Sequence, residues 1–245
     1  MDGAGRRRLF LMRHGHVDYF APDLTDPRAV PLTDEGRSQA DAARQALAGQ
    51  RFDIAVCSGL PRTRQTAEIV LRDRPIAAEI EDVDGLEELK SGWLRADTRE
   101  ELAARLAFCF DDAAAPGARF LPDGEIFVDA EARIRASIEE IVLQRDWRVA
   151  LIVAHEGVNR ILLGWACGGG LATVRSFEQD LGCINVIDLD VTPAVEGDGL
   201  QIERALLKSI NITPYDYLKD GLPRTSLEHL FDVDFGAARP LRRDI

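Results

Sequence analysis

Short apolar runs alternate with longer amphipathic segments along most of the chain. Each run is bounded by charged or turn-forming residues, which is the pattern of a strand buried in a sheet. The strands predicted on this basis are residues 7–12, 52–58, 76–82, 148–155, 183–191 and 200–207.

The segments between these runs carry the spacing and the end signals of helices. Thr33 is a good N-cap, Pro61 suits a first helical turn, and Thr98 with Glu101 has the spacing of a capping box. The helices predicted are residues 32–50, 61–73, 97–115, 125–144 and 156–166.

Strands that alternate with helices predict an α/β fold, here a three-layer sandwich with a mostly parallel central sheet and helices on both faces. Residues 1–245 fit one domain. Residues from about Lys90 to Leu121 interrupt the alternation. They predict an inserted helical segment over the sheet, because they are too few to bury a core of their own. The tail from about Asn211 is expected to be irregular.

Composition and charge narrow the class of function. The chain is 46% hydrophobic and 29% charged, and its formal net charge is −12. Because a chain this acidic repels polyanions, binding to nucleic acid or to an anionic membrane surface is not expected. The four cysteines form no C-x-x-C pair and are expected to be buried free thiols. The apolar runs are too short for a membrane span or a signal peptide, so a cytoplasmic protein is expected.

Polar side chains gather where the predicted strands end. Arg13, His14 and Gly15 follow the first strand, Arg62 lies in the first turn of a helix after the second, and His155 ends the strand at 148–155. Ligands bind at the carboxyl ends of strands in parallel α/β sheets, so these residues are expected to converge.

This combination of side chains suits phosphoryl transfer. Arginine matches phosphate oxygens with two parallel hydrogen bonds, and neutral imidazole can form a covalent phosphohistidine. Gly15 is expected to let phosphate approach the backbone, and His155 to stabilise charge on the transferring oxygens. No metal or other cofactor is expected, because arginines and histidines supply the positive charge. No predicted helix carries histidine and carboxylate ligands at metal-binding spacing.

Six short motifs follow one another along about residues 8–190: LMRHG (11–15), LTDEGRSQA (32–40), SGLPRTRQTA (58–67), LEEL (86–89), DGE (123–125) and VAHEGVNRILL (153–163). In this order they resemble the histidine phosphatase superfamily, also called the phosphoglycerate-mutase-like family. The resemblance implies that His14 is the phosphorylated nucleophile and that Arg13, Arg62 and His155 hold the phosphate. It also implies a two-step reaction in which the alcohol leaves before water or a second acceptor attacks.

The same resemblance gives roles to two carboxylates. Glu88 is implied as the proton donor to the leaving oxygen, with its pKa raised by the substrate phosphate and by the neighbouring Glu87. Glu125 matches a Gly-Glu pair that opens a helix in many members.

Departures from the family pattern concern the pocket and the insertion. Many members have Thr and Asn where this chain has Val17 and Phe20, so an apolar pocket wall formed by these two residues is expected. His16 is expected in the pocket wall or at the surface. The RHY segment that mutases carry in the insertion is absent, which argues against a mutase.

Several nearby residues are expected to have structural roles or to lie at the surface, with no part in catalysis. Arg64 lies two positions from Arg62 on a helix, so it should point away from the site. Trp93, Phe108 and Phe110 could line the pocket, but core packing is favoured for them. His229, in the tail, is expected to be structural or exposed.

Three functions stay open. The leading hypothesis is a metal-independent phosphomonoester hydrolase that acts on a small phosphorylated metabolite through a phosphohistidine. A phosphoglycerate-type phosphomutase would return the phosphate to a monophosphate acceptor. A catalytically weak binding module would only hold a phosphorylated ligand, but such a module needs neither nucleophile nor acid. The expected partner is a small-molecule phosphate ester, and a homodimer is compatible with the sequence.

Overall fold

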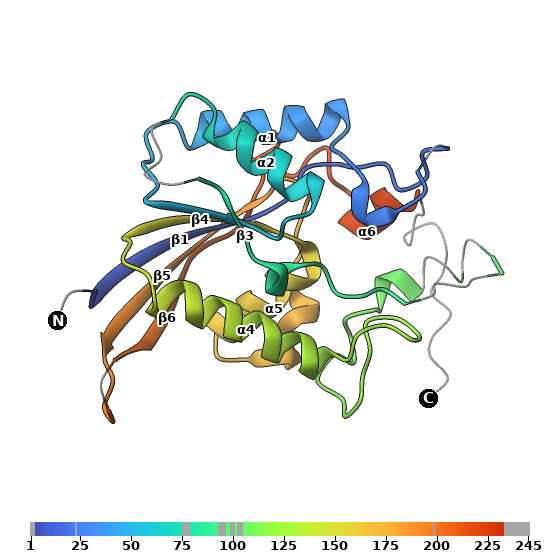
Figure 1. The fold of residues 1–245 in the computed structure, drawn as a ribbon. Helices are drawn as coiled ribbons and strands as arrows, with labels where there is room; N and C mark the ends of the chain where they lie inside the picture. Colours follow the sequence, from blue (N-terminus) through green and yellow to red (C-terminus); the bar gives the residue numbers. More distant parts are fainter. Residues whose placement is uncertain are drawn as a thin grey trace.

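The structure of the protein is a computed structural model that describes residues 3–22, 24–74, 79–92, 97, 98, 101, 105–197 and 199–232. Its strands form one sheet in the order β3-β2-β4-β1-β5-β6 (Figure 1). The strands are β1 (Gly5–Arg13), β2 (Ile54–Cys57), β3 (Glu81–Asp82), β4 (Val149–Ala154), β5 (Ile184–Pro193) and β6 (Leu200–Ile212).

The sheet is mixed. From β3 through β2 and β4 to β1, each strand runs parallel to its neighbour. β5 runs antiparallel to both β1 and β6. β5 and β6 are consecutive in the chain and pair as a hairpin, which needs no crossover helix.

Helices cover both faces of the sheet, which confirms the predicted three-layer α/β fold. In Figure 1, α1 and α2 lie on one face, and α4 and α5 lie on the other. The helices are α1 (Asp34–Ala46), α2 (Pro61–Leu71), α4 (Phe127–Leu143), α5 (Glu156–Ala166) and α6 (Ser226–Leu230), with 3₁₀ turns at Pro27–Ala29, Asp84–Leu86 and Gly170–Ser176.

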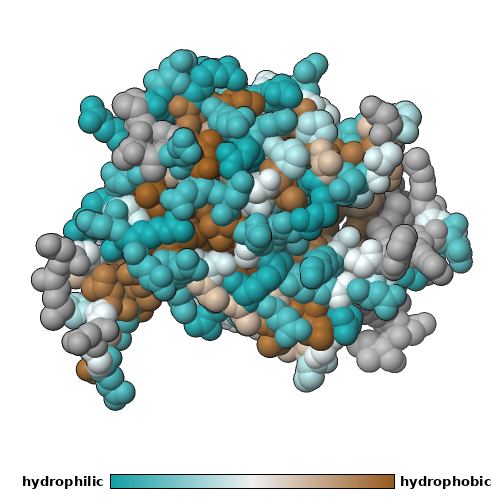
Figure 2. Space-filling model, viewed as in Figure 1, coloured by the Kyte–Doolittle hydropathy of each residue, from teal (hydrophilic) through white to brown (hydrophobic). Residues whose placement is uncertain are grey.

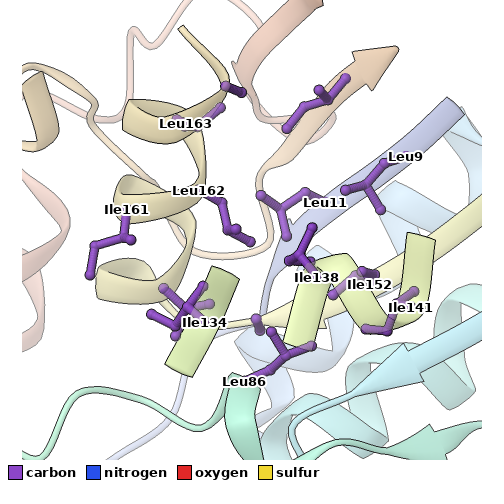
Figure 3. Close-up of a cluster of buried hydrophobic side chains, with 14 of the residues drawn as sticks. Leu9, Leu11, Leu86, Ile134, Ile138, Ile141, Ile152, Ile161, Leu162 and Leu163 are labelled. Carbon is purple, nitrogen blue, oxygen red and sulfur yellow. The ribbon is translucent and has the colours of Figure 1, made fainter. Parts of the chain in front are cut away.

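The apolar run of β1 is continuous because both of its faces are covered. Side chains alternate along a strand, so Leu9 and Leu11 reach the cluster under α4 and α5, which Figure 3 shows. Phe10 and Met12 point the other way and join a second cluster under α1 and α2. The sheet therefore separates two apolar cores, and its strand ends lie between them.

The surface in the view of Figure 2 is mainly hydrophilic, with apolar patches between the charged side chains. Among the residues that the structure describes, none of the helices has the length and apolar character needed to cross a membrane.

Three predicted segments differ from the structure. Of the strand expected at 76–82, only Glu81–Asp82 forms a strand, and residues 76–78 lie outside the described residues. Of the helix expected at 97–115, residues 101 and 105–107 are helical and 108–115 form turns. The tail is not irregular throughout: β6 extends to Ile212, and a complete capping box between Thr225 and Glu228 begins α6.

Candidate active site

The carboxyl ends of β1 and β4 place the two predicted histidines side by side. Arg13 and Ala154, the last residues of the two strands, are partners in the sheet register. The next residues, His14 and His155, have ring centroids 5.2 Å apart. Arg62, in the first turn of α2, joins Arg13 and His14 in lining a cavity of about 480 Å³.

His14 has the geometry and the charge state of a nucleophile. Its Nδ1 lies 2.7 Å from the carbonyl oxygen of Gly15, which can only accept, so Nδ1 carries the proton and Nε2 the lone pair. Burial, with Arg62 and Arg13 beside the ring, holds the pKa of His14 well below its usual value. The ring is therefore neutral at neutral pH, which leaves Nε2 free to attack.

Three buried nitrogen atoms near His14 have no hydrogen-bond partner within the described part of the chain. They are Nε of Arg13, Nε of Arg62 and Nδ1 of His155. Leaving a buried polar group unpaired costs about 1–3 kcal/mol, so such groups indicate where a ligand binds. The two guanidinium groups are donors suited to phosphate oxygens.

His155 is oriented by a chain of hydroxyl groups. The Thr63 hydroxyl donates to the carbonyl of Leu60 at 2.9 Å, so it can only accept from Ser58, 2.9 Å away. The Ser58 oxygen then accepts from Nε2 of His155 at 2.8 Å. Burial and Arg62 hold the pKa of His155 well below its usual value, which leaves Nδ1 as an unpaired acceptor until a ligand brings a proton to it.

Glu88 lies in the wall of the same cavity. Its Oε1 accepts from the peptide N–H of Leu89 at 2.9 Å. Burial raises the pKa of Glu88, and Glu156 raises it further. Glu87 is not the cause, contrary to the prediction, because its carboxylate pairs with Arg28 through two contacts of 2.7 Å.

The segment that carries Glu88 is clamped by Arg133 and Glu125. Arg133 donates to the carbonyl oxygens of Gly85 and Glu87, each at 2.9 Å, and to both oxygens of Glu125 at 2.7 and 2.8 Å. Glu125 also accepts from the peptide N–H of Lys90 at 3.2 Å. Glu125 thus contacts the backbone that positions Glu88, not the pocket itself.

Glu156 is a site residue to which the sequence analysis gave no role. It is buried 3.0 Å from Arg13 and 2.7 Å from Arg160, and its Oε2 accepts from the Ser226 hydroxyl at 2.8 Å. Burial acts to raise the pKa of Glu156, but Arg13 and Arg160 outweigh it, so the pKa is lowered. The only sequence signal was its position directly after His155, at the start of α5.

The structure shows another reason why a glycine occupies position 15, besides the predicted approach of phosphate. A Cβ atom at Gly15 would lie 2.4 Å from the carbonyl oxygen of Gly36, so the residue must be small for α1 to pack against it. Its peptide N–H already donates to Thr66 at 3.2 Å. The structure thus gives Gly15 a packing role, and the approach of phosphate stays a prediction.

Of the three predicted wall residues, only Phe20 lines the cavity. Val17 is fully buried in a small apolar cluster with Val30, Leu32, Ala40 and Ile69, because its bridge to Leu32 turns it inward. His16 lies outside the cavity, where Nδ1 is 2.8 Å from the Thr33 hydroxyl. The wall prediction is wrong for Val17 for this reason, and of the two positions predicted for His16 the structure excludes the wall.

We expect Val17→Thr to lower stability and to leave substrate preference unchanged. The substitution would place a hydroxyl in an apolar cluster, at a cost of about 1–3 kcal/mol. Urea unfolding of both proteins measures the change. A shift in substrate preference at unchanged stability would show that Val17 contacts the substrate after all.

The structure agrees with some of the predictions made for Arg64, the aromatic residues and the cysteines, and differs from others. Arg64 points away from the site and pairs with Asp82 at 2.5 Å. Phe110 is buried and also lines the cavity, Phe108 lines a neighbouring hollow, and Trp93 lies outside the described residues. The cysteines are free as predicted, but only Cys57 and Cys183 are buried; Cys109 is half-buried and Cys167, after the last residue of α5, is exposed.

Fold and site together define an α/β protein in which two histidines and two arginines meet at the strand ends. The sequence pattern of the histidine phosphatase superfamily (branch 1) matches residues 9–194. The chain belongs to this superfamily.

Relatives and solved structures agree with this assignment. The chain is 30% identical over 190 residues to the adenosylcobalamin/alpha-ribazole phosphatase of Escherichia coli (strain K12), covering 75% of this chain and 90% of that protein. It is 33% identical over 194 residues to the glucosyl-3-phosphoglycerate phosphatase of Mycolicibacterium vanbaalenii, covering 67% and 80%. The alpha-ribazole phosphatase of Shigella flexneri superimposes with a TM-score of 0.62 at 26% identity, over 83% of this chain and 96% of that one.

Proposed function

We propose that the protein is a phosphomonoester hydrolase that works through a phosphohistidine at His14 and needs no metal for the chemical step. The observation that carries this proposal is the set of unpaired buried nitrogens on Arg13, Arg62 and His155 around a neutral histidine. The two guanidinium groups would donate to phosphate oxygens, and Nδ1 of His155 would accept from a protonated phosphate oxygen, while Nε2 of His14 faces the phosphorus. The phosphatase relatives support hydrolysis of small phosphate esters.

The reaction balances with the residues present. Nε2 of His14 forms a bond to phosphorus, the ester P–O bond breaks, and the leaving oxygen takes a proton from Glu88. The Glu88 carboxylate then accepts a proton from water, whose oxygen attacks phosphorus while the P–N bond breaks. Inorganic phosphate leaves, with His14 neutral and Glu88 protonated again.

The raised pKa of Glu88 fits the acid role. A carboxyl group at its ordinary pKa is ionised at pH 7 and has no proton to give, whereas burial here favours the protonated form. Burial has the opposite consequence for His14, since it favours the neutral ring. In one pocket, burial thus shifts the acid toward its protonated form and the nucleophile toward its neutral form.

Arg62→Ala is expected to lower kcat/KM by about a hundredfold or more, because it removes a charge-assisted donor from the transferring phosphate. Arg64→Ala, two positions along the same helix, is expected to change kcat/KM little, since Arg64 contacts Asp82 instead. Steady-state rates of the two variants make the comparison. Equal losses at both positions would mean that Arg62 does not bind the phosphate.

The substrate that we propose carries an apolar or aromatic group next to its phosphate. The walls above His14 are largely apolar; they are formed by Tyr19, Phe20, Leu60, Leu89, Leu106, Phe110, Phe120, Leu121, Leu227, Leu230 and Phe231. The rings of Phe20 and Phe231 meet edge to face, with centroids 5.7 Å apart, at the mouth. Arg28, Glu87, Lys90 and Ser91 are polar members of the same wall, but its apolar majority favours an apolar or aromatic substrate group, so a phosphoglycerate-type mutase is not favoured.

Phe231→Ala should lower kcat/KM for naphthyl phosphate by about five- to tenfold, since part of an aromatic contact is lost. It should leave kcat/KM for glycerol phosphate almost unchanged. The ratio of the two values in each protein is the measurement. Wild-type enzyme that already prefers glycerol phosphate or phosphoglycerate over the aryl ester would contradict the proposed substrate class.

A further inference from the structure

A second group of side chains lies outside the proposed catalytic pocket. One donor atom each from His16, Glu35 and His229 lies within 4.8 Å of the other two. The three residues come from separate parts of the chain: the loop after β1, the first turn of α1, and α6. Figure 1 shows α6 beside the loop that follows β1. Sequence spacing could not indicate this group, because its members are brought together only by the fold.

The arrangement leaves the Glu35 carboxylate without a cationic partner. Its oxygens lie 4.0 Å from Nδ1 of His16 and 3.9 Å from Nε2 of His229, which is too far for a hydrogen bond. Among the described residues its one hydrogen bond is the 3.1 Å contact from the Gln39 amide, and neither lysine nor arginine pairs with it. A carboxylate and two imidazoles therefore face one another across a space that a cation could fill.

The group is both supported and accessible. The Thr33 hydroxyl, 2.8 Å from Nδ1, fixes the orientation of the His16 ring. Glu35 and His229 are exposed and can rotate. They line a hollow of about 550 Å³ together with Asp216, Arg224 and Asp180, and the Asp180 carboxylate lies 2.7 Å from Nζ of Lys219.

We propose that His16, Glu35 and His229 form a Zn²⁺ site. Two imidazoles and a carboxylate are a donor set of zinc sites, with a water in the fourth position. Imidazole donors disfavour Mg²⁺ and Ca²⁺, which prefer oxygen ligands. Tetrahedral zinc places its donors about 3.3 Å apart, so the exposed side chains must close by ~1.5 Å at most.

The position of His229 gives the ion a structural role. α6 also carries Leu227 and Leu230, and Phe231 follows it; all three line the catalytic cavity. A zinc ion would fasten this wall to the loop that directly follows His14. It would take no part in phosphoryl transfer, which the site groups on the other side of that loop perform in the proposed function.

Zinc binding to the full chain tests the site without any substrate. After treatment with a chelator and its removal, competition against a chromogenic zinc indicator should show one Zn²⁺ per chain, bound with a Kd of about 1 μM or lower. Glu35→Gln and His229→Ala should each weaken binding at least ~10-fold. Cys167→Ser, which removes an exposed thiol, should not change it. Unchanged affinity in both ligand variants, or no binding, would overturn the proposal.

Thermal unfolding gives a second readout that separates a lost site from a damaged fold. Zinc at about a hundred times Kd should raise the Tm of the wild-type chain by ~5 °C or more, and millimolar Mg²⁺ should not. The His229→Ala chain should melt at the wild-type temperature without zinc and show no rise with it. A rise of equal size in this variant would place the ion elsewhere.

The role of the ion as a fastener rests on the proposed function and has its own measurement. Zinc at one equivalent should lower KM for naphthyl phosphate at least ~3-fold by ordering the wall. The chelator should leave kcat for nitrophenyl phosphate unchanged. Zinc binding without a change in KM would overturn the fastening role and leave the site standing. Loss of kcat with the chelator would overturn the metal-independent step instead.

Discussion

Glu88→Gln is expected to slow hydrolysis of an alkyl phosphate by about a hundred- to ten-thousandfold and to slow hydrolysis of nitrophenyl phosphate far less. An alkoxide is a strongly basic leaving group, so its expulsion depends on a proton from a nearby acid. Nitrophenolate is a weak base and leaves without such help. Glutamine has the shape of protonated glutamic acid but cannot deliver a proton.

The comparison uses two esters in one variant, so partial misfolding lowers both rates and cannot imitate the result. Glu87→Gln is the matched control, because Glu87 is adjacent in sequence but pairs with Arg28. Burst kinetics must show that hydrolysis of the phosphoenzyme does not limit the rate. Under that condition, equal losses on both esters in Glu88→Gln would remove Glu88 from the acid role. A selective loss in the control would give that role to Glu87.

His14→Ala is expected to lower turnover of every phosphate ester by at least about ten-thousandfold, including esters with good leaving groups. The nucleophile acts in both steps, so no choice of substrate can bypass it. The phosphate site should survive in this variant, since Arg13 and Arg62 do not depend on His14 for their contacts. Competition with vanadate or phosphate should therefore still show binding. Turnover above one hundredth of the wild-type rate would exclude His14 as the nucleophile.

The core of the fold could be predicted from local pattern. β1, β4 and α5 each have one strong signal, an apolar run or a helix bounded by turn residues, and the structure keeps their predicted bounds within two residues. β3 could not be predicted well, because its two-residue pairing with β2 depends on tertiary contact and not on its own sequence. α6 was missed although Thr225 and Glu228 form a capping box, because a helix of five residues has almost no periodicity.

In the candidate site, too, the residues marked by local sequence could be predicted, and those placed by tertiary contacts could not. Arg13, His14 and His155 could be predicted as neighbours from their positions at strand ends, because the carboxyl ends of parallel strands lie at the same edge of the sheet. Glu156 was missed, since its contacts with Arg13, Arg160 and Ser226 join segments far apart in the chain. Val17 was misplaced because a position in a family motif does not show which way the side chain points, and the backbone bridge to Leu32 turns that of Val17 into an apolar cluster.

The site chemistry depends most on a covalent bond between phosphorus and Nε2 of His14. The direct measurement is to mix the wild-type chain with a labelled phosphate ester, quench within milliseconds in alkali, and locate the phosphate by mass spectrometry. Phosphohistidine survives base and is lost in acid, so we expect a base-stable, acid-labile phosphate on His14, formed and consumed at rates compatible with kcat. Base-stable phosphate on another residue, or turnover at full rate with no phosphorylated protein at any quench time, would contradict the mechanism.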